Sequence, residues 1–170
     1  NALLKVYVNL CDKNKLLVEE EIKNKILDIE HVIFNEQNYK GSLIPGSKDV
    51  LEFLTAKKDS VHLLTRGNKK EQNKKIDVLD IRKYFKEIIV VPNNKYPIFK
   101  EFSEKVLDKN KTYSVGDSID SDINPATECG LRAICLVQSS LSLSYDVKQI
   151  AHPEKVKKID SIEEIIKKYE

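Results

Sequence analysis

An acidic turn occupies residues 116 to 122, where the sequence reads GDSIDSD. A hard cation such as Mg²⁺ takes oxygen ligands in octahedral geometry, and it commonly binds one or two protein carboxylates together with water and phosphate. Asp117 and Asp122 could supply one edge of such a site. The alternative is that Asp120 or Ser121 only caps the helix that follows.

Two other segments carry groups that suit a phosphate. Thr65 has a hydroxyl group, and the backbone amides of Arg66 and Gly67 beside it could add hydrogen bonds to phosphate oxygens. The ammonium group of Lys95 could neutralise the charge of a phosphoryl group and of clustered aspartates. The alternatives are a structural threonine and a solvated lysine, because the chain is rich in lysine.

Each of these segments follows a short run of β-branched and other apolar residues, which is typical of a strand. Five such runs occur, at 61–65, 87–91, 112–116, 132–137 and, more weakly, 156–159. Stretches with a helical period of about 3.6 residues lie at 47–58, 69–79, 98–107 and 123–129. This alternation predicts an α/β fold with a parallel sheet covered by helices. Because ligands bind beyond the carboxyl ends of such strands, we expect Thr65, Lys95 and Asp117 to lie at one edge of the sheet.

The first part of the chain has a different character. Residues 12–38 are rich in lysine and glutamate and helical in pattern, whereas residues 1–11 fit either a strand or a helix. The turn-forming segment GSLIPG at 41–46 indicates a boundary. We therefore predict a helical segment at 1–42 and an α/β core at 43–170. Ser161 followed by Glu164 is a capping signature, which predicts a final helix and a complete end of the core.

The composition, with 41% hydrophobic and 33% charged residues, is that of a soluble globular protein. Lys and Arg outnumber Asp and Glu by only 29 to 27 and are scattered, so no nucleic-acid partner is expected. The chain has no apolar run of membrane-spanning length and no signal-peptide pattern, which predicts a cytoplasmic protein without a membrane partner. The three cysteines match no zinc or disulfide framework, and we expect them to be buried. The isolated histidines are assigned no role, and the oligomeric state is not predicted.

The order of the candidate groups resembles the haloacid dehalogenase superfamily. A threonine at one strand end (HLLTRG), a lysine after the next strand and the GDSIDSD turn after the third match its second, third and fourth motifs. The resemblance covers residues 43–170. It implies a Rossmannoid parallel sheet flanked by helices, with a small helical cap, and a hydrolase that acts on a phosphate monoester.

On the phosphate side, the resemblance implies that Thr65 hydrogen-bonds the transferring phosphoryl group, with Arg66 and Gly67 beside the same phosphate. It also implies that Lys95 bridges this group to the acidic turn. Lys100 is a second candidate for the lysine role, although it falls inside the helical pattern that follows.

On the metal side, the resemblance implies that Asp117 binds Mg²⁺ directly. Asp122 would orient Lys95 and metal-bound water, so Thr65, Lys95 and Asp122 are the expected catalytic residues and Asp117 the expected metal ligand.

The residue that would attack phosphorus is not visible. The family uses the first Asp of a DxD motif at the end of its first, central strand, and the second Asp acts as general acid and base. No such motif precedes Thr65, and the nearest candidate, NLCD at 9–12, begins with Asn9. A sheet without its central strand would leave unpaired backbone groups on both neighbours, at about 1–3 kcal/mol each. We therefore expect the nucleophile upstream of Asn1, with a degenerate site inside the chain as the alternative.

The expected function is a magnesium-dependent phosphohydrolase that acts, through an aspartyl-phosphate, on a small phosphorylated metabolite closed off from water by the cap. A noncatalytic binding or regulatory module of the same fold is the alternative. A flavodoxin-like or receiver-type domain would have another strand order and would not need Lys95 and Asp122 to converge. Dehalogenation fits the acidic turn less well, because halide displacement from carbon offers no phosphoryl charge for a metal to neutralise.

Overall fold

The computed structural model describes residues 2–33, 35–137 and 149–169. The chain divides into two compact units, Asn1–Leu43 and Ile44–Glu170. The division falls next to the boundary expected from the sequence. That the first unit acts as a cap stays a prediction.

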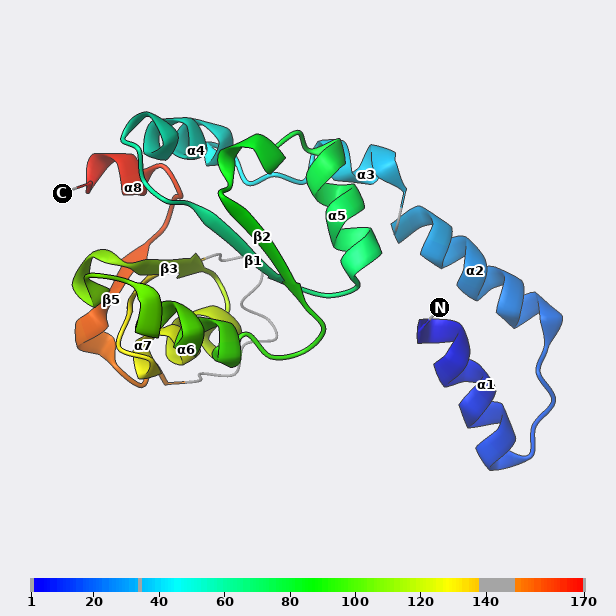
Figure 1. Ribbon diagram of the computed structural model, residues 1–170. Coiled ribbons are helices and arrows are strands. Elements are labelled where there is room, and N and C mark those ends of the chain that lie inside the picture. The colour runs from blue at the N-terminus through cyan, green and yellow to red at the C-terminus, as the bar shows by residue number, and fades with distance from the viewer. Residues whose placement is uncertain (1, 34, 138–148, 170) are drawn as a thin grey trace. The chain divides into compact units, whose positions relative to one another are not determined.

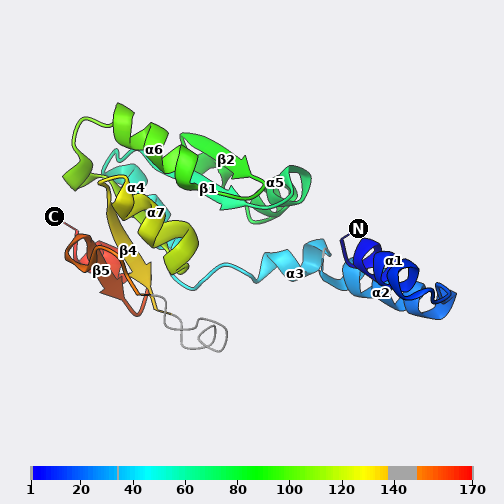
Figure 2. The ribbon, with the colours of Figure 1, turned by 90° about the horizontal axis from the view of Figure 1, so that it is seen from below.

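The first unit is helical. It consists of α1 (Ala2–Asn14), α2 (Glu20–Ile33) and α3 (Glu36–Lys40). Figures 1 and 2 both show α1 and α2 lying side by side. The Tyr7 hydroxyl oxygen accepts a hydrogen bond of 3.0 Å from the backbone N–H of Glu19, and Cys11 on α1 is buried. The segment whose pattern allowed a strand or a helix therefore forms a helix that packs along its neighbour.

The second unit contains the five expected strands. They are β1 (His62–Arg66), β2 (Glu87–Val91), β3 (Tyr113–Gly116), β4 (Arg132–Leu136) and β5 (Val156–Ile159). All pairings are parallel, and the strands form one sheet in the order β1-β2 and another in the order β3-β4-β5. The parallel α/β architecture expected from the sequence is confirmed.

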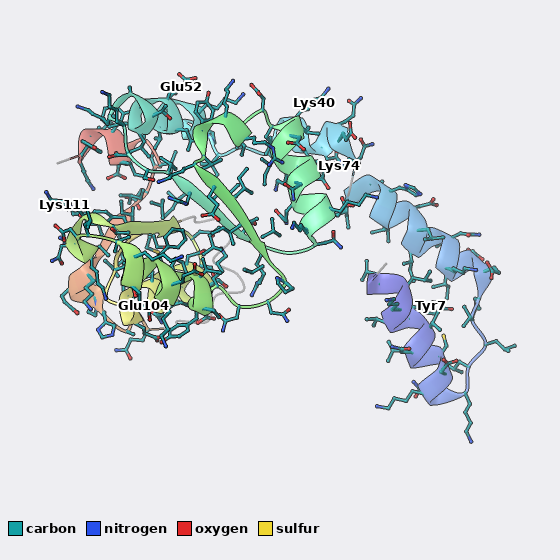
Figure 3. All side chains as sticks on the ribbon, viewed as in Figure 1. Tyr7, Lys40, Glu52, Lys74, Glu104 and Lys111 are labelled. Carbon is teal, nitrogen blue, oxygen red and sulfur yellow. The ribbon has the colours of Figure 1, made fainter. Side chains whose placement is uncertain are left out.

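Helices separate these strands along the chain (Figure 1). They are α4 (Ser47–Ala56), α5 (Lys69–Val78), α6 (Tyr96–Lys105), α7 (Asn124–Glu128) and α8 (Glu164–Lys167), with short 3₁₀ turns at Arg82–Tyr84, Lys109–Lys111 and Pro153–Lys155. Buried Phe99, Ala126 and Leu131 pack with Leu64 of β1, and buried Val50, Leu136, Ile159 and Ile165 form a second cluster. Glu52 on α4, labelled in Figure 3, accepts a hydrogen bond of 2.9 Å from the Tyr84 hydroxyl. None of the helices in the described part of the chain is both long and apolar enough to cross a membrane.

The helix expected at 123–129 is present as α7, and an irregular turn precedes it. A π-helical turn, Ile119–Ile123, precedes α7, and Ser118 caps this turn by accepting a hydrogen bond from the Ser121 N–H at 3.2 Å. The alternative, that Asp120 or Ser121 only caps the helix that follows, is therefore wrong. Pro125 lies in the first turn of α7, where its missing N–H costs no hydrogen bond.

Four strand edges of the second unit have no partner among the described strands, and two of them belong to β1 and β3. The Arg132 N–H donates to the Thr112 carbonyl, and the Lys86 N–H donates to the Val61 carbonyl. Because alternate residues of a parallel strand hydrogen-bond to opposite sides, the backbone groups of Val115 on β3 and of Leu64 on β1 face away from these pairings. Val115 is also 45% exposed, although parallel strands are normally covered on both faces.

The start of α8 carries the predicted capping contact. The Glu164 carboxylate accepts hydrogen bonds from the backbone N–H of Asp160 at 2.8 Å and of Ser161 at 3.2 Å. The Lys168 ammonium group and these two backbone donors lower the pKa of Glu164 from 4.5 to about 2. A carboxylate near the amino end of a helix is also favoured by the helix dipole.

This lowered pKa gives a pH-dependent prediction. Since the pKa of Glu164 is lower in the folded than in the unfolded chain, its stabilisation is present above pH 4.5 and is lost as the pH falls through about 2. Glu164→Gln is expected to make the unfolding free energy less dependent on pH across that interval, as urea unfolding at a series of pH values would measure. Glu104→Gln is the matched control because Glu104 is exposed. An unchanged pH profile in Glu164→Gln would refute the assignment.

Candidate active site

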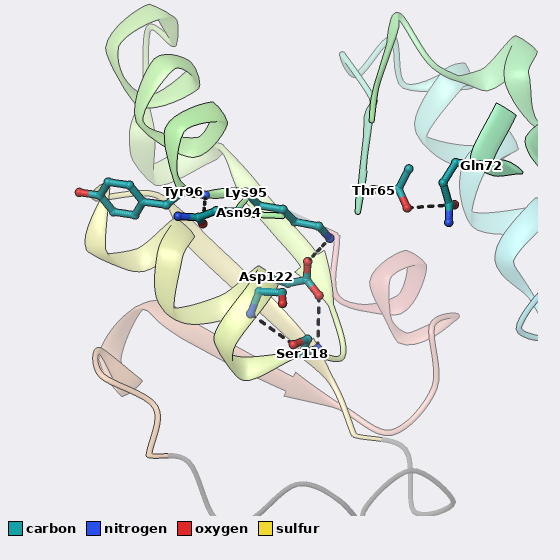
Figure 4. Close-up of polar contacts among 8 residues, drawn as sticks. Thr65, Gln72, Asn94, Lys95, Tyr96, Ser118 and Asp122 are labelled. Carbon is teal, nitrogen blue, oxygen red and sulfur yellow. Dashed lines mark hydrogen bonds and ion pairs between the residues drawn. The ribbon is translucent and has the colours of Figure 1, made fainter. Parts of the chain in front are cut away.

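A nearly buried ion pair joins the segments that follow β2 and β3. The Lys95 ammonium group donates to Oδ1 of Asp122 at 2.6 Å, and both side chains are only 12% exposed (Figure 4). Lys95 immediately precedes α6, whose first turn is held by a hydrogen bond of 2.9 Å from the Tyr96 N–H to the Asn94 side chain. Lys100, the second candidate, is exposed on α6. Of the two lysines, the structure therefore pairs Lys95 with the acidic turn.

The backbone of the acidic turn fixes the orientation of Asp122. Its Oδ2 accepts a hydrogen bond of 3.3 Å from the Ser118 N–H, and its own N–H donates to the Ser118 carbonyl at 2.9 Å. A Cβ atom at Gly116 would lie 2.6 Å from the Cβ, Cγ and Oδ2 atoms of Asp122. Glycine at 116 is therefore needed for the close approach of Asp122 to the end of β3.

Asp117 follows β3 directly and is exposed. Burial raises the pKa of the Cys135 thiol on β4, the nearby carboxylates of Asp117 and Asp122 raise it further, and Lys158 opposes them. Two negative charges thus act on this end of the sheet, and Lys95 offsets one of them. Cys135 stays protonated at neutral pH and belongs to the core, as expected for this buried cysteine.

Thr65 does not contact the Lys95–Asp122 pair. It lies at the carboxyl end of β1, and its hydroxyl group donates to Oε1 of Gln72 on α5 at 3.2 Å, apart from the ion pair in Figure 4. The Gly67 N–H donates to the Val91 carbonyl at 2.9 Å, so this amide is occupied within the fold, contrary to the expectation that it faces a phosphate. The Arg66 side chain is exposed.

The acidic turn offers one exposed carboxylate that could contribute to a metal site. No three His, Cys, Asp or Glu side chains converge as metal ligands within residues 2–33, 35–137 and 149–169. Asp117 offers an exposed carboxylate, while both oxygens of Asp122 already accept hydrogen bonds. The donors therefore fit a hard cation that takes one carboxylate from this turn and its other ligands from elsewhere.

In the described part of the second unit, no histidine contacts this ion pair. At the opposite, amino end of β1, His62 contacts Ser60 through Nε2 at 3.2 Å, with Nδ1 3.6 Å from Glu87. His31 is exposed, and His152 lies 3.5 Å from Glu154. The structure thus gives no reason to assign any of them to the site.

Haloacid dehalogenase-like hydrolases match this chain over residues 9–136. Because the match covers more than half of the chain, the protein belongs to this family, and the resemblance seen in the sequence is confirmed. No curated protein matches the chain.

Solved structures share the fold. A haloacid dehalogenase-like hydrolase from Xanthomonas campestris matches with a TM-score of 0.69 and 18% identity over 93% of this chain and 61% of its own. A haloacid dehalogenase phosphatase from Thermococcus onnurineus matches with a TM-score of 0.63 and 19% identity, over 97% of this chain and 86% of its own. A Bacillus subtilis protein described as a hydrolase of this family, bound to magnesium, matches with a TM-score of 0.62 and 18% identity, over 98% of this chain and 80% of its own. At these identities the likeness shows the fold alone, and this chain spans 61% of the length of the Xanthomonas protein.

Proposed function

We propose that this chain forms the phosphate-binding and metal-binding part of a magnesium-dependent phosphohydrolase that acts on a small phosphorylated metabolite. The observation that carries the proposal is the Lys95–Asp122 pair, 2.6 Å apart and 12% exposed on each side. Removing two charges from water is costly, and an ion pair of this kind is weak evidence for stability alone. A preorganised ammonium group at the carboxyl ends of the strands is, however, well suited to stabilise the charge of a transferring phosphoryl group.

Each site residue has a proposed role. The Lys95 ammonium group would donate to a phosphoryl oxygen while Asp122 holds it in place, and the Thr65 hydroxyl would donate to another phosphoryl oxygen. Arg66 would add positive charge beside Thr65, whereas Gly67 would contribute a close backbone approach rather than its N–H. Asp117 would hold Mg²⁺, which when bound screens the charge of the phosphoryl group and of the turn. A cytoplasmic location stays a prediction.

The nucleophile is proposed to lie outside the described residues. An aspartate would attack phosphorus and the P–O bond to the substrate would break, while the second aspartate of the motif would give its proton to the leaving oxygen. Water would then hydrolyse the aspartyl-phosphate. We propose that the attacking aspartate lies at the end of a strand upstream of Asn1 that fills the space between β1 and β3. The unpaired edges of β1 and β3 and the exposed Val115 support this placement.

Hydrogen exchange tests the missing strand. In the full-length gene product, the amides of Leu64 and Val115 are expected to exchange slowly, because the added strand would accept their hydrogen bonds. Leu63 and Ser114 are the matched controls, since their backbones face the established partners β2 and β4. If the amides of Leu64 and Val115 exchange fast while those of Leu63 and Ser114 are protected, the proposed strand is refuted.

The activity is tested by phosphate release from an aryl phosphate. Full-length protein is expected to release phosphate with Mg²⁺ and to lose this activity when the metal is chelated or when Asp117 is replaced by Asn. Absence of turnover in a folded protein that binds Mg²⁺ would favour a noncatalytic module of the same fold. Turnover that persists in Asp117→Asn would contradict the metal role of Asp117.

A further inference from the structure

Gln72 is the direct partner of the proposed phosphate-binding hydroxyl. It lies in the first turn of α5, and its Oε1 accepts the hydrogen bond of 3.2 Å from Thr65 (Figure 4). This turn is firmly held, because the Asn68 side chain accepts from the N–H groups of Lys70 at 2.9 Å and Glu71 at 3.3 Å. The Gln72 amide therefore projects from a fixed helix start back towards the end of β1.

The backbone between the two partners leaves room for this amide. Gly67 has a φ of +147°, and a Cβ atom there would lie 2.8 Å from Nε2 of Gln72 and 3.3 Å from its Cγ. The Gln72 side chain thus lies along the α-carbon of Gly67 to reach Thr65. A side chain at position 67 would displace it, so the Thr65–Gln72 contact depends on the turn between them.

The chemistry of an amide suits a hydroxyl group that must donate a hydrogen bond to an anion. A threonine hydroxyl has one donor and two acceptor lone pairs, and a glutamine amide has one acceptor oxygen and a donor NH₂ group. In this structure the Thr65 proton goes to Oε1, and Nε2 has no hydrogen-bond partner in the described part of the chain. Rotation of the amide by half a turn would let Nε2 donate to Thr65 and free the hydroxyl proton for a phosphate oxygen.

We propose that Gln72 is a positioning residue for the phosphate site, an inference that rests on the proposed function. With the site empty, Gln72 accepts a hydrogen bond from the Thr65 hydroxyl and fixes the orientation of that group. With phosphate bound, its amide donates to Thr65 while Thr65 donates to the anion. Gln72 thereby sets the affinity for the phosphoryl group through Thr65, without needing to touch the reacting atoms.

Binding of inorganic phosphate to the full-length protein tests this role without requiring turnover. Gln72→Leu keeps the size of the side chain but removes both hydrogen-bonding groups, and it is expected to raise the Kd for phosphate about fivefold, the usual effect of one lost hydrogen bond between neutral groups. In a Thr65→Val background the same change is expected to matter less than about twofold, because coupled residues are not additive. Gln37→Leu, on the exposed surface of α3, is the matched control and should leave the Kd unchanged.

A glutamate variant separates positioning from a merely structural contact. Gln72→Glu keeps an oxygen that accepts from Thr65, so a merely structural role would be rescued, and any remaining loss of phosphate binding would come from charge repulsion that salt screens. The proposal instead predicts that phosphate binds at least as weakly as in Gln72→Leu at high as well as low salt, because a carboxylate cannot donate to Thr65. Gln72→Glu also tests the positioning role if Gln72→Leu fails to fold.

The outcomes distinguish this inference from the proposed function. An additive effect of Gln72→Leu in the Thr65→Val background, or normal binding in Gln72→Glu at high salt, overturns the role of Gln72 even if the protein hydrolyses phosphate esters. If Gln72→Leu weakens phosphate binding only when Thr65 is present, but the full-length protein shows no turnover, the positioning role of Gln72 is supported. The proposed hydrolase activity is then the part that is overturned.

Discussion

Replacing Lys95 with methionine is expected to lower the free energy of unfolding by about 3 kcal/mol, because it leaves the nearly buried Asp122 carboxylate without its counter-charge. The same change is expected to lower phosphate release at least about a hundredfold, since the site loses its main cationic donor. Urea unfolding and steady-state kinetics on one preparation measure both effects.

Two further variants make the result specific. Lys100→Met removes an exposed lysine from the same helix and is expected to change stability and activity little. In the double variant Lys95→Met with Asp122→Asn, both charges are gone, so most of the stability should return while activity stays low. A Lys95→Met protein as stable as Lys100→Met would show that the ion pair does not hold Asp122.

Gly116→Ala is expected to have the second-largest effect. The new Cβ would lie 2.6 Å from the Cβ of Asp122, an atom that cannot move without its backbone. Overpacking of this kind costs about 1–3 kcal/mol, and the displaced Asp122 would also loosen its hold on Lys95. Thermal unfolding and phosphate affinity should therefore both decline in this variant.

Gly41→Ala is the matched control for this change. A Cβ at Gly41 would meet nothing within 4 Å, and its φ of −105° suits any residue. Alanine there is expected to be neutral or to stabilise by about 0.4–1 kcal/mol, because it restricts the unfolded chain. Equal melting temperatures for Gly116→Ala and Gly41→Ala would contradict the close approach of Asp122 to Gly116.

Strands were the most predictable elements of this chain. Runs such as IIVV at 88–91 are apolar throughout, as strands covered on both faces are, and turn residues lie nearby on both sides. The approach of Lys95 to Asp122 was implied by the resemblance to the haloacid dehalogenase superfamily, in which Asp122 would orient Lys95. The catalytic roles of these residues stay predictions.

The start of the chain was ambiguous because its apolar residues satisfy two periods. Leu4, Val6, Val8 and Leu10 alternate as in a strand, yet they lie on α1. Packing along α2 decides between these periods, and the buried Cys11 belongs to that packing, whereas Leu10 is 53% exposed. Local pattern alone holds no information about the neighbouring helix.

Three polar contacts of the site were missed for a related reason. Ser118 holds the π-helical turn, Asn94 holds the start of α6, and Gln72 holds Thr65. The spacing of Asn94 and Ser118 before helices was a usable capping signal. Gln72 gave no such signal, because its contact depends on the return of α5 over Gly67.

Trapping of a phosphoenzyme is the sharpest test of hydrolysis through an aspartyl-phosphate. Full-length protein is mixed with Mg²⁺ and a radiolabelled aryl phosphate and is quenched in acid within the first turnover. A covalently labelled protein, sensitive to hydroxylamine, is expected, with the phosphate on an aspartate upstream of Asn1. Phosphate release without labelled protein, or label on Asp117 or Asp122, would contradict this mechanism.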